Sequence, residues 1–187
     1  MAIGLLGGSF NPPHAAHRLI SLLALKRLDL DRVWWLVTPG NPLKDNQKLP
    51  PASARAALAR RVANHPRIVV TTVEAEAGLV YTADTIAFLK ARAPGVDFVW
   101  IMGADNLLTF HRWQGWRDIA AMLPIAVFDR PGATLRTASS RAAQALARFR
   151  VDESGSRNLP RNSPPCWALL HGQRSTLSST ALRRAMS

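Results

Sequence analysis

AIGLLGGSFNPPHAAH, residues 2–17, is the stretch that decides the fold. It opens with a short apolar run at residues 2–6, turns at the paired glycines Gly7 and Gly8, and leads into residues 15–28, where apolar side chains recur at helical spacing. A strand, a glycine turn and a helix in direct succession form the first part of a βαβ unit. The stretch therefore predicts an α/β fold whose first strand feeds straight into a helix.

The same alternation continues along the chain. Apolar and β-branched runs predict further strands at residues 32–38, 68–73, 97–102, 125–128 and 167–170. Helical spacing or alanine content predicts helices at residues 53–64, 83–92, 119–123, 138–149 and 180–186, and the polar, proline-rich residues 152–165 predict a loop. We therefore expect one domain, residues 1–187, with a doubly wound parallel sheet and right-handed crossovers. A small C-terminal helical appendage at residues 172–187 completes this prediction.

The composition is that of an ordinary globular protein. The chain has 187 residues, of which 48% are hydrophobic, enough to bury one sizeable core. Cys166 is the single cysteine, so an intrachain disulfide and a cysteine-based zinc site are both excluded. No basic leader precedes the first apolar run, and no run reaches the ~20 residues of a membrane helix. These features predict a cytoplasmic protein without a membrane segment.

The charge balance favours an anionic partner. Lys and Arg number 24 against 12 Asp and Glu, a formal net charge of +12. Such a charge does not choose between nucleic acid, a membrane surface and phosphorylated metabolites. Arginine outnumbers lysine 20 to 4, a bias that a GC-rich genome can also produce. The basic residues are scattered, with neither a polybasic block nor interleaved aromatic residues, and this pattern disfavours a nucleic-acid platform.

The turn after the first strand has the composition of a phosphate site. Glycine lets the backbone approach a ligand closely, and the following helix start adds unpaired N–H groups and a positive dipole end. The turn is neither a Walker A loop nor a GxGxxG turn. In place of the Walker lysine it carries His14 and His17, whose spacing of three lets both imidazoles face one anion from the first helical turn. A metal pair, which lacks an obvious third ligand, and simple surface or capping histidines remain as alternatives.

A second candidate phosphate site stands near the other end of the chain, in LSSTALR, residues 177–183. Ser179 and Thr180 supply hydroxyls and free N–H groups at a helix start, and Arg183 follows by three and can fold its charged fork over the same anion. Taken alone, the motif is better explained as an ordinary N-cap on a short helix. The occurrence of two such sites in one chain favours phosphate binding.

These motifs resemble a known family. GGSFNPPHAAH at residues 7–17 is similar to the GxFxPxHxGH signature of the nucleotidyltransferase superfamily, and LSSTALR is similar to its ISSTxxR motif. The intervening PGNPLK, YTADT and MGADNL segments resemble the bacterial nicotinate mononucleotide adenylyltransferases in particular. The departures are Ala16 in place of the usual glycine and Asn11 where aspartate is common.

The resemblance implies a Rossmann-like nucleotidyltransferase fold and a reaction. The enzyme would transfer the adenylyl group of ATP to nicotinic acid mononucleotide, with Mg²⁺, and release pyrophosphate and nicotinic acid adenine dinucleotide. The catalytic residues would be His14, His17 and Arg183, with His17 on the α-phosphate in the transition state. The implied ATP-binding residues are Gly8, Ser9, Phe10, Gly103, Asp105, Ser179 and Thr180. The resemblance implies no metal ligand from the protein.

The resemblance also implies contacts to the mononucleotide. Lys44 would lie near its phosphate, Thr82 and Thr85 would offer N–H groups to the nicotinate carboxylate, and Trp113 would stack on the pyridine ring. Taken alone, Lys44 is an ordinary solvated lysine and any one tryptophan is a core residue; Trp34, Trp35 and Trp100 are assigned to the core.

Two alternatives to this function stay open. One is an adenylyltransferase for another phosphorylated acceptor, either the amidated mononucleotide or phosphopantetheine. The other is a non-catalytic nucleic-acid-binding protein on the same scaffold, which predicts salt-dependent binding without turnover. The sequence leaves the oligomeric state open as well.

Overall fold

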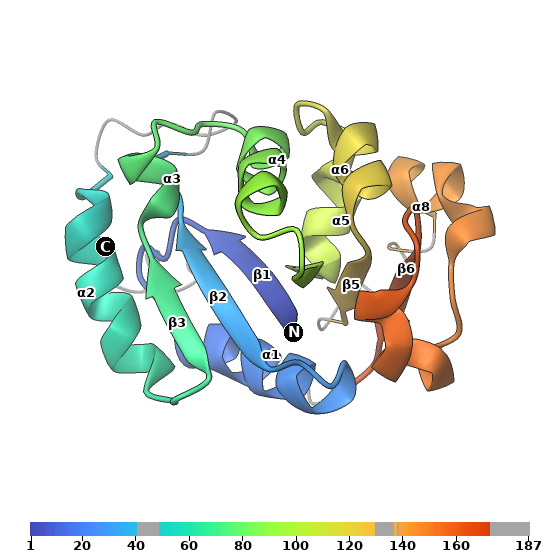
Figure 1. The fold of residues 1–187 in the computed structure, drawn as a ribbon, viewed down its shortest axis with the longest axis horizontal. Helices are drawn as coiled ribbons and strands as arrows, with labels where there is room; N and C mark the ends of the chain where they lie inside the picture. Colours follow the sequence, from blue (N-terminus) through green and yellow to red (C-terminus); the bar gives the residue numbers. More distant parts are fainter. Residues whose placement is uncertain (41–48, 130–136, 138, 173–187) are drawn as a thin grey trace.

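The computed structural model describes residues 1–40, 49–129, 137 and 139–172. Within these residues, parallel strands form a six-stranded sheet in the order β3-β2-β1-β4-β5-β6 (Figure 1). The strands are β1 (Ala2–Gly8), β2 (Arg32–Val37), β3 (Ile68–Thr71), β4 (Asp97–Gly103), β5 (Ile125–Phe128) and β6 (Trp167–Leu170). The doubly wound parallel sheet predicted from the sequence is confirmed.

Helices connect these strands and cover both faces of the sheet. They are α1 (Ala15–Arg27), α2 (Ala52–Ala63), α3 (Val73–Glu76), α4 (Thr82–Arg92), α5 (Ala104–Phe110), α6 (Trp116–Met122), α8 (Arg141–Ala145) and the 3₁₀ helices η1 (Ala147–Phe149) and η2 (Glu153–Arg161). One hydrophobic cluster joins α1, α2 and η2 to the sheet, and a second joins α4, α5, α6 and α8 to the opposite face. None of the helices that the structure describes is long and apolar enough to span a bilayer.

Strand β1 shows why the sheet is buried on both sides. Its side chains alternate between the two clusters: Ala2 and Leu6 belong to the α1 side, whereas Ile3 and Leu5 belong to the α4 side. Successive residues of a strand point to opposite faces, so a central strand covered by helices on both sides must be apolar at every position. The unbroken apolar run at the start of the chain therefore marks a central strand.

The strand order places a switch point between β1 and β4. The chain runs outward from β1 to β2 and β3, and then returns to the other side of β1 with β4. Leu6 of β1 pairs in register with Ile101 of β4, so these two strands end at the same edge of the sheet. In open parallel sheets, ligands bind beyond the carboxyl ends of the strands at such a point.

The structure differs from the sequence predictions at several elements. The strand predicted at residues 68–73 ends at Thr71, because the Thr71 hydroxyl accepts the Val73 N–H at 3.1 Å and opens helix α3. The helix predicted at residues 138–149 is α8 followed by the 3₁₀ turn η1. Helix α5 was not predicted, although the spacing of three between its buried residues, Ala104, Leu107 and Phe110, is helical.

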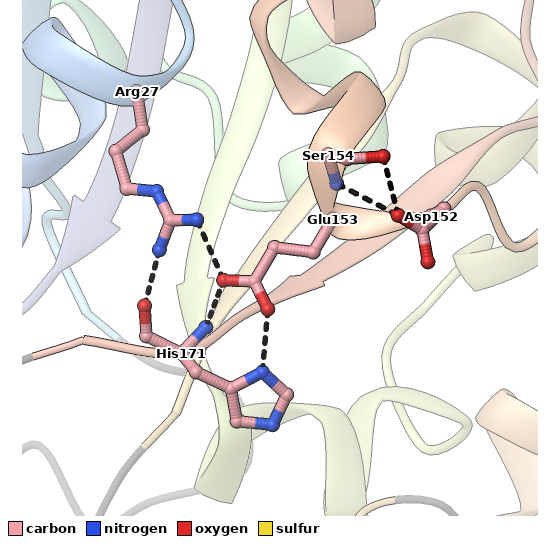
Figure 2. Close-up of polar contacts among 5 residues, drawn as sticks. All are labelled: Arg27, Asp152, Glu153, Ser154 and His171. Carbon is pink, nitrogen blue, oxygen red and sulfur yellow. Dashed lines mark hydrogen bonds and ion pairs between the residues drawn. The ribbon is translucent and has the colours of Figure 1, made fainter.

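The polar stretch at residues 152–165 is a second correction, since most of it is the 3₁₀ helix η2 and not a loop. The Asp152 carboxylate caps its start by accepting from the Ser154 N–H at 2.9 Å and the Ser154 hydroxyl at 2.6 Å (Figure 2). Leu159 is fully buried in the α1-side cluster. One buried leucine and a capped first turn therefore fold a segment whose composition is typical of a loop.

A polar network ties η2 to the first helix and the last strand. Figure 2 shows Glu153 of η2 between Arg27 of α1 and His171, the residue after β6. The Glu153 carboxylate lies 2.6 Å from Arg27 Nη2, accepts the His171 N–H at 2.7 Å, and lies 2.7 Å from His171 Nδ1. Arg27 also donates to the His171 carbonyl oxygen. The network fixes where the chain leaves the sheet.

Candidate active site

The candidate site lies at the carboxyl edge of the sheet, at the switch point between β1 and β4. Strand β1 ends at Gly8, the turn that follows carries Ser9 and Phe10, and the adjacent strand β4 ends at Gly103. The structure therefore brings two of the predicted ATP-binding groups, which are about a hundred residues apart in sequence, to neighbouring strand ends. Asp105 follows on the first turn of α5 and is exposed.

Packing explains the glycines and the shape of the turn. A Cβ atom on Gly7 would lie 2.7 Å from the Trp100 ring, so close packing on the sheet requires glycine there. Phe10 has a φ of +47°, in the left-handed region, and its buried ring stacks on Trp35 with 4.9 Å between ring centroids. The ring thus anchors the turn in the core and leaves its backbone at the edge of the sheet.

The two histidines are in contact. His14 is the N-cap of α1, in extended conformation, and His17 is the third residue of the helix. Their rings stack with 3.8 Å between centroids, and the His14 backbone N–H donates to His17 Nδ1 at 3.2 Å. A nitrogen that accepts carries no proton, so the neutral His17 ring carries its proton on Nε2. Ala16, between them, is buried within the helix, where alanine in place of glycine is well tolerated.

Two consecutive hydrogen bonds hold the first turn of α1 against the sheet. The Trp35 indole Nε1 donates to the Ser21 hydroxyl at 2.7 Å, and that hydroxyl donates to the His17 carbonyl oxygen at 2.8 Å. Trp35 and Ser21 are fully buried. The predicted core position of Trp35 is therefore confirmed, as is that of Trp100, whereas Trp34 is half-buried against the opposite cluster. The two hydrogen bonds fix the helical turn that carries His17.

Arg55 is a residue of this region that sequence reasoning missed. It lies on α2 and is 1% exposed. Its guanidinium donates to the carbonyl oxygens of Ser9 at 2.5 Å, Thr38 at 2.8 Å and Pro50 at 2.7 Å. Burial lowers the pKa of Arg55 from its ordinary value. Local sequence gives no hint of this role, since Arg55 is one of several arginines on an alanine-rich helix.

The residues predicted to recognise the pyridine lie around the start of α4. Thr82 is the first residue of this helix, and Thr85 is fully buried. The Thr85 N–H donates to the Tyr81 carbonyl oxygen at 3.1 Å, and the Thr85 hydroxyl donates to Glu74 Oε1 at 3.0 Å. Burial raises the pKa of Glu74, against the effect of hydrogen bonds from Thr85 and Thr38. The bond from Thr85 to Tyr81 is the first of the backbone hydrogen bonds of α4. Thr82 precedes it, in the first turn, where the N–H groups of a helix have no partner within the helix.

Trp113 is half-buried next to the second hydrophobic cluster. Its ring packs edge-on against Phe110, with 5.4 Å between centroids, and against Trp100, with 6.2 Å. These contacts fix the orientation of the indole ring while part of it stays exposed. Four further predicted site residues, Lys44, Ser179, Thr180 and Arg183, lie outside the described residues, as does the helix predicted at residues 180–186.

Comparisons with known proteins agree with this geometry. Residues 5–185 match the cytidylyltransferase-like family. The "probable nicotinate-nucleotide adenylyltransferase" of Bradyrhizobium sp. (strain ORS 278) is 60% identical over 183 residues, which cover 98% of this chain and 95% of the relative. The protein of the same name from Brucella abortus (strain 2308) is 55% identical over 184 residues, again 98% of this chain and 95% of the relative.

A solved structure shares the fold. Plasmodium falciparum nicotinic acid mononucleotide adenylyltransferase, complexed with NaAD, superposes with a TM-score of 0.72 over 98% of this chain and 82% of that one. Its identity of 16% makes this a likeness of fold alone. The full-length sequence relatives carry the narrower assignment. The chain thus belongs to the cytidylyltransferase-like family, among the nicotinate-nucleotide adenylyltransferases.

Proposed function

We propose that the protein transfers the adenylyl group of ATP to nicotinic acid mononucleotide, giving nicotinic acid adenine dinucleotide and pyrophosphate in NAD biosynthesis. The observation that carries this proposal is the stacked pair His14 and His17 at the switch point of the sheet, in a chain 60% identical to a named adenylyltransferase. A nucleotide placed there would meet the backbone of the β1 turn and the end of β4.

The chemistry needs positioning and charge stabilisation more than proton transfer. The attacking group is a phosphate oxygen, already ionised at pH 7, so no general base is needed. Catalysis consists of holding two polyanions in line and stabilising the charge that develops at the α-phosphorus. His17, with its proton on Nε2, donates to an α-phosphate oxygen in the transition state. His14 binds the ATP phosphates beside it, and the turn amides near Gly8, Ser9 and Phe10 bind the same group.

A magnesium ion accompanies the ATP in this proposal. Mg²⁺ takes oxygen ligands, keeps several waters, and is often bound through substrate phosphates with only one or two carboxylates. The described residues hold no group of three His, Cys, Asp or Glu side chains suited to a metal, and the side chains beside the turn are imidazoles. This donor set fits an ion carried by the triphosphate. When bound there, it neutralises charge on the phosphates.

The remaining predicted contacts complete the proposed site. The proposed phosphate-binding appendage, residues 172–187, binds the β- and γ-phosphates through Ser179, Thr180 and Arg183. These residues thereby stabilise the departing pyrophosphate. Lys44 binds the phosphate of the mononucleotide, and Asp105 accepts from the ribose hydroxyls near Gly103.

Recognition of the nicotinate uses the start of α4 and Trp113. Since Thr85 already donates its N–H to Tyr81, Thr82 is the stronger of the two candidates for the carboxylate. Trp113 stacks on the pyridine ring with the exposed part of its indole.

Product formation tests the proposal. The purified protein is incubated with ATP, Mg²⁺ and one acceptor at a time: nicotinic acid mononucleotide, its amide, or phosphopantetheine. Pyrophosphate release is measured, and the dinucleotide is identified by mass. We expect the highest kcat/KM with the acid mononucleotide. Turnover with phosphopantetheine alone would show that the acceptor is not the mononucleotide. Salt-dependent nucleic-acid binding without any turnover would contradict the enzyme assignment.

A further inference from the structure

Arg55 holds together three separate segments at the edge of the sheet where the site lies. Its guanidinium donates to the carbonyl oxygen of Ser9 in the turn after β1, to those of Thr38 and Pro39 after β2, and to that of Pro50 before α2. The distances run from 2.5 Å for Ser9 to 3.4 Å for Pro39. A side chain 46 residues away in sequence thus fixes the backbone of the proposed phosphate turn.

Burying an arginine in this way is costly, and the cost suggests a role beyond stability. The side chain is 1% exposed, and its hydrogen-bond partners among the described residues are carbonyl oxygens, not a carboxylate. Desolvation of a charge costs several kcal/mol unless hydrogen bonds compensate for it. A well-packed apolar side chain would fill the same volume without that cost. The position therefore uses the fork of donors that only arginine offers.

The bond to Ser9 determines how the next peptide group points. In a trans peptide the carbonyl of residue i and the N–H of residue i+1 lie in one plane and point in opposite directions across the C–N bond. Because Arg55 binds the Ser9 carbonyl oxygen, the Phe10 N–H points away from Arg55. The buried Phe10 ring, stacked on Trp35, holds the same peptide from its other end. The peptide 9–10 is thereby locked in one orientation.

Arg55 also fixes the backbone after β2 and before α2, through its hydrogen bonds to Thr38, Pro39 and Pro50. These residues flank the stretch 40–49, which carries the proposed phosphate-binding Lys44 in its sequence. Thr38 also donates its N–H to the Gly8 carbonyl at 3.1 Å, so the ends of β1 and β2 are joined directly. Arg55 therefore joins the turn after β1 to the residues on both sides of the stretch 41–48.

We propose that Arg55 is a positioning residue for adenylyl transfer, one that aims the Phe10 amide at the reacting phosphate and fixes the turn after β1 relative to the end of β2. The inference rests on the proposed function. Arg55 itself does not touch substrate; its guanidinium is occupied by carbonyl oxygens. Lysine keeps the charge but has a single nitrogen, which cannot reach three carbonyl groups in a plane.

The test compares Arg55→Lys and Arg55→Ala with Arg61→Ala, a change of an exposed arginine on the same helix. Circular dichroism at the assay temperature establishes that each variant is folded. We expect Arg55→Lys to lower kcat about 100-fold, as for a small misplacement of a catalytic group, and to raise the KM of either substrate much less. Arg55→Ala leaves a cavity of guanidinium shape, so added guanidinium or methylguanidinium at millimolar concentration should restore part of its kcat. Arg61→Ala should match the wild type.

The outcomes separate this inference from the proposed function. A wild-type protein that makes no dinucleotide contradicts the proposed function itself. An active wild type with a folded Arg55→Lys variant of unchanged kcat overturns the positioning role. So does the failure of both Arg55 variants to fold at low temperature, or the absence of guanidinium rescue in a folded Arg55→Ala, because each would make Arg55 a residue of stability alone.

Discussion

His17 shows how one side chain is prepared by its neighbours. Its Nδ1 accepts the His14 N–H, its ring stacks on His14, and its carbonyl is held by Ser21. The ring is therefore oriented before any ligand arrives. Preorganised donors of this kind stabilise a transition state at little reorganisation cost.

Replacing His17 with alanine should lower kcat by about 100- to 1,000-fold, the usual effect of losing one donor to a developing charge. ATP affinity should stay nearly unchanged, because the contact forms chiefly in the transition state. Steady-state kinetics and ATP titration check both parts. A change confined to KM would assign His17 to ground-state binding instead.

Replacing Trp113 with alanine should raise the KM for the pyridine mononucleotide by a factor corresponding to about 1–3 kcal/mol of stacking. The variant also loses core packing, since Trp113 contacts Phe110 and Trp100. Trp116→Ala is the matched control, because Trp116 packs on the same Phe110 ring at 5.8 Å. Both variants should lose thermal stability, but only Trp113→Ala should change this KM. Equal KM values in the two variants would show that the pyridine ring does not stack on Trp113.

Glu74 predicts a pH dependence of stability. Burial raises its pKa in the folded protein above the ordinary 4.5, and this effect outweighs the hydrogen bonds from Thr85 and Thr38, which lower it. The folded state therefore favours the protonated acid. The free energy of unfolding is highest at low pH, where Glu74 is protonated, and it falls as the pH rises through the folded pKa and the buried carboxyl ionises. Glu74→Gln should gain in Tm over the wild type from pH 4.5 upward. Glu76→Gln, an exposed change on the same short helix, should show no such trend in thermal denaturation.

At the scale of elements, the first turn of α1 depends on a contact with β2. The hydrogen bond from the Trp35 indole to the Ser21 hydroxyl is buried, and this hydroxyl in turn donates to the carbonyl oxygen of the half-buried His17. Helix α1 has no acidic residue in its first turn and no Ser, Thr, Asp or Asn at its N-cap. Its start is therefore set by the histidine cap and by this packing more than by local capping chemistry.

Replacing Ser21 with alanine should destabilise the protein by about 1–3 kcal/mol, since it leaves the buried Trp35 N–H without its acceptor. Because the same change frees the carbonyl of His17, kcat should fall as well, although less than in His17→Ala. Chemical denaturation and steady-state kinetics measure the two effects, with exposed Ser53→Ala on α2 as the control. Unchanged stability would show that this hydrogen-bond chain contributes nothing.

At the scale of the whole molecule, the network of Arg27, Glu153 and His171 joins the start and the end of the described chain (Figure 2). Burial opposes ionisation of Glu153, but hydrogen bonds from His171 and Arg27 outweigh it and lower the pKa of this carboxyl below 4.5. A lowered pKa means that the stabilisation is present above the unfolded value and is lost as the pH falls through the folded one.

Glu153→Gln should therefore lower stability at pH 7 by about 1 kcal/mol, a value reduced for the partial exposure of the pair. That corresponds to a fall in Tm of about 2–4 °C for a chain of this size. The difference should shrink as the pH falls through the folded pKa of Glu153, where the wild-type carboxyl takes up its proton. Arg157→Gln, which breaks the exposed pair with Asp29, should have little effect at any pH. A difference that persists at low pH would contradict an ionic role for Glu153.

The sequence reveals what depends on neighbours along the chain. The spacing of apolar residues marks the strands β5 and β6 at their observed bounds, and the glycine turn between β1 and α1 is visible in composition alone. Helix α5 was not predicted, although the spacing of three between its buried residues is helical. The 3₁₀ helix η2 was not predicted from its polar sequence either. It forms because Leu159 is buried against a sheet whose strands come from other parts of the chain.

The candidate site divides in the same way. The sequence by itself determined the parallel α/β order, the phosphate-type turn and the spacing of His14 and His17, because these follow from local periodicity and turn chemistry. Only the tertiary structure decided that the two rings stack, that Trp35 and Ser21 hold the helix that carries them, and that Arg55 supports Ser9. The last two depend on contacts between residues 14 and 46 positions apart in sequence, and no local pattern records which distant carbonyl a buried guanidinium will meet.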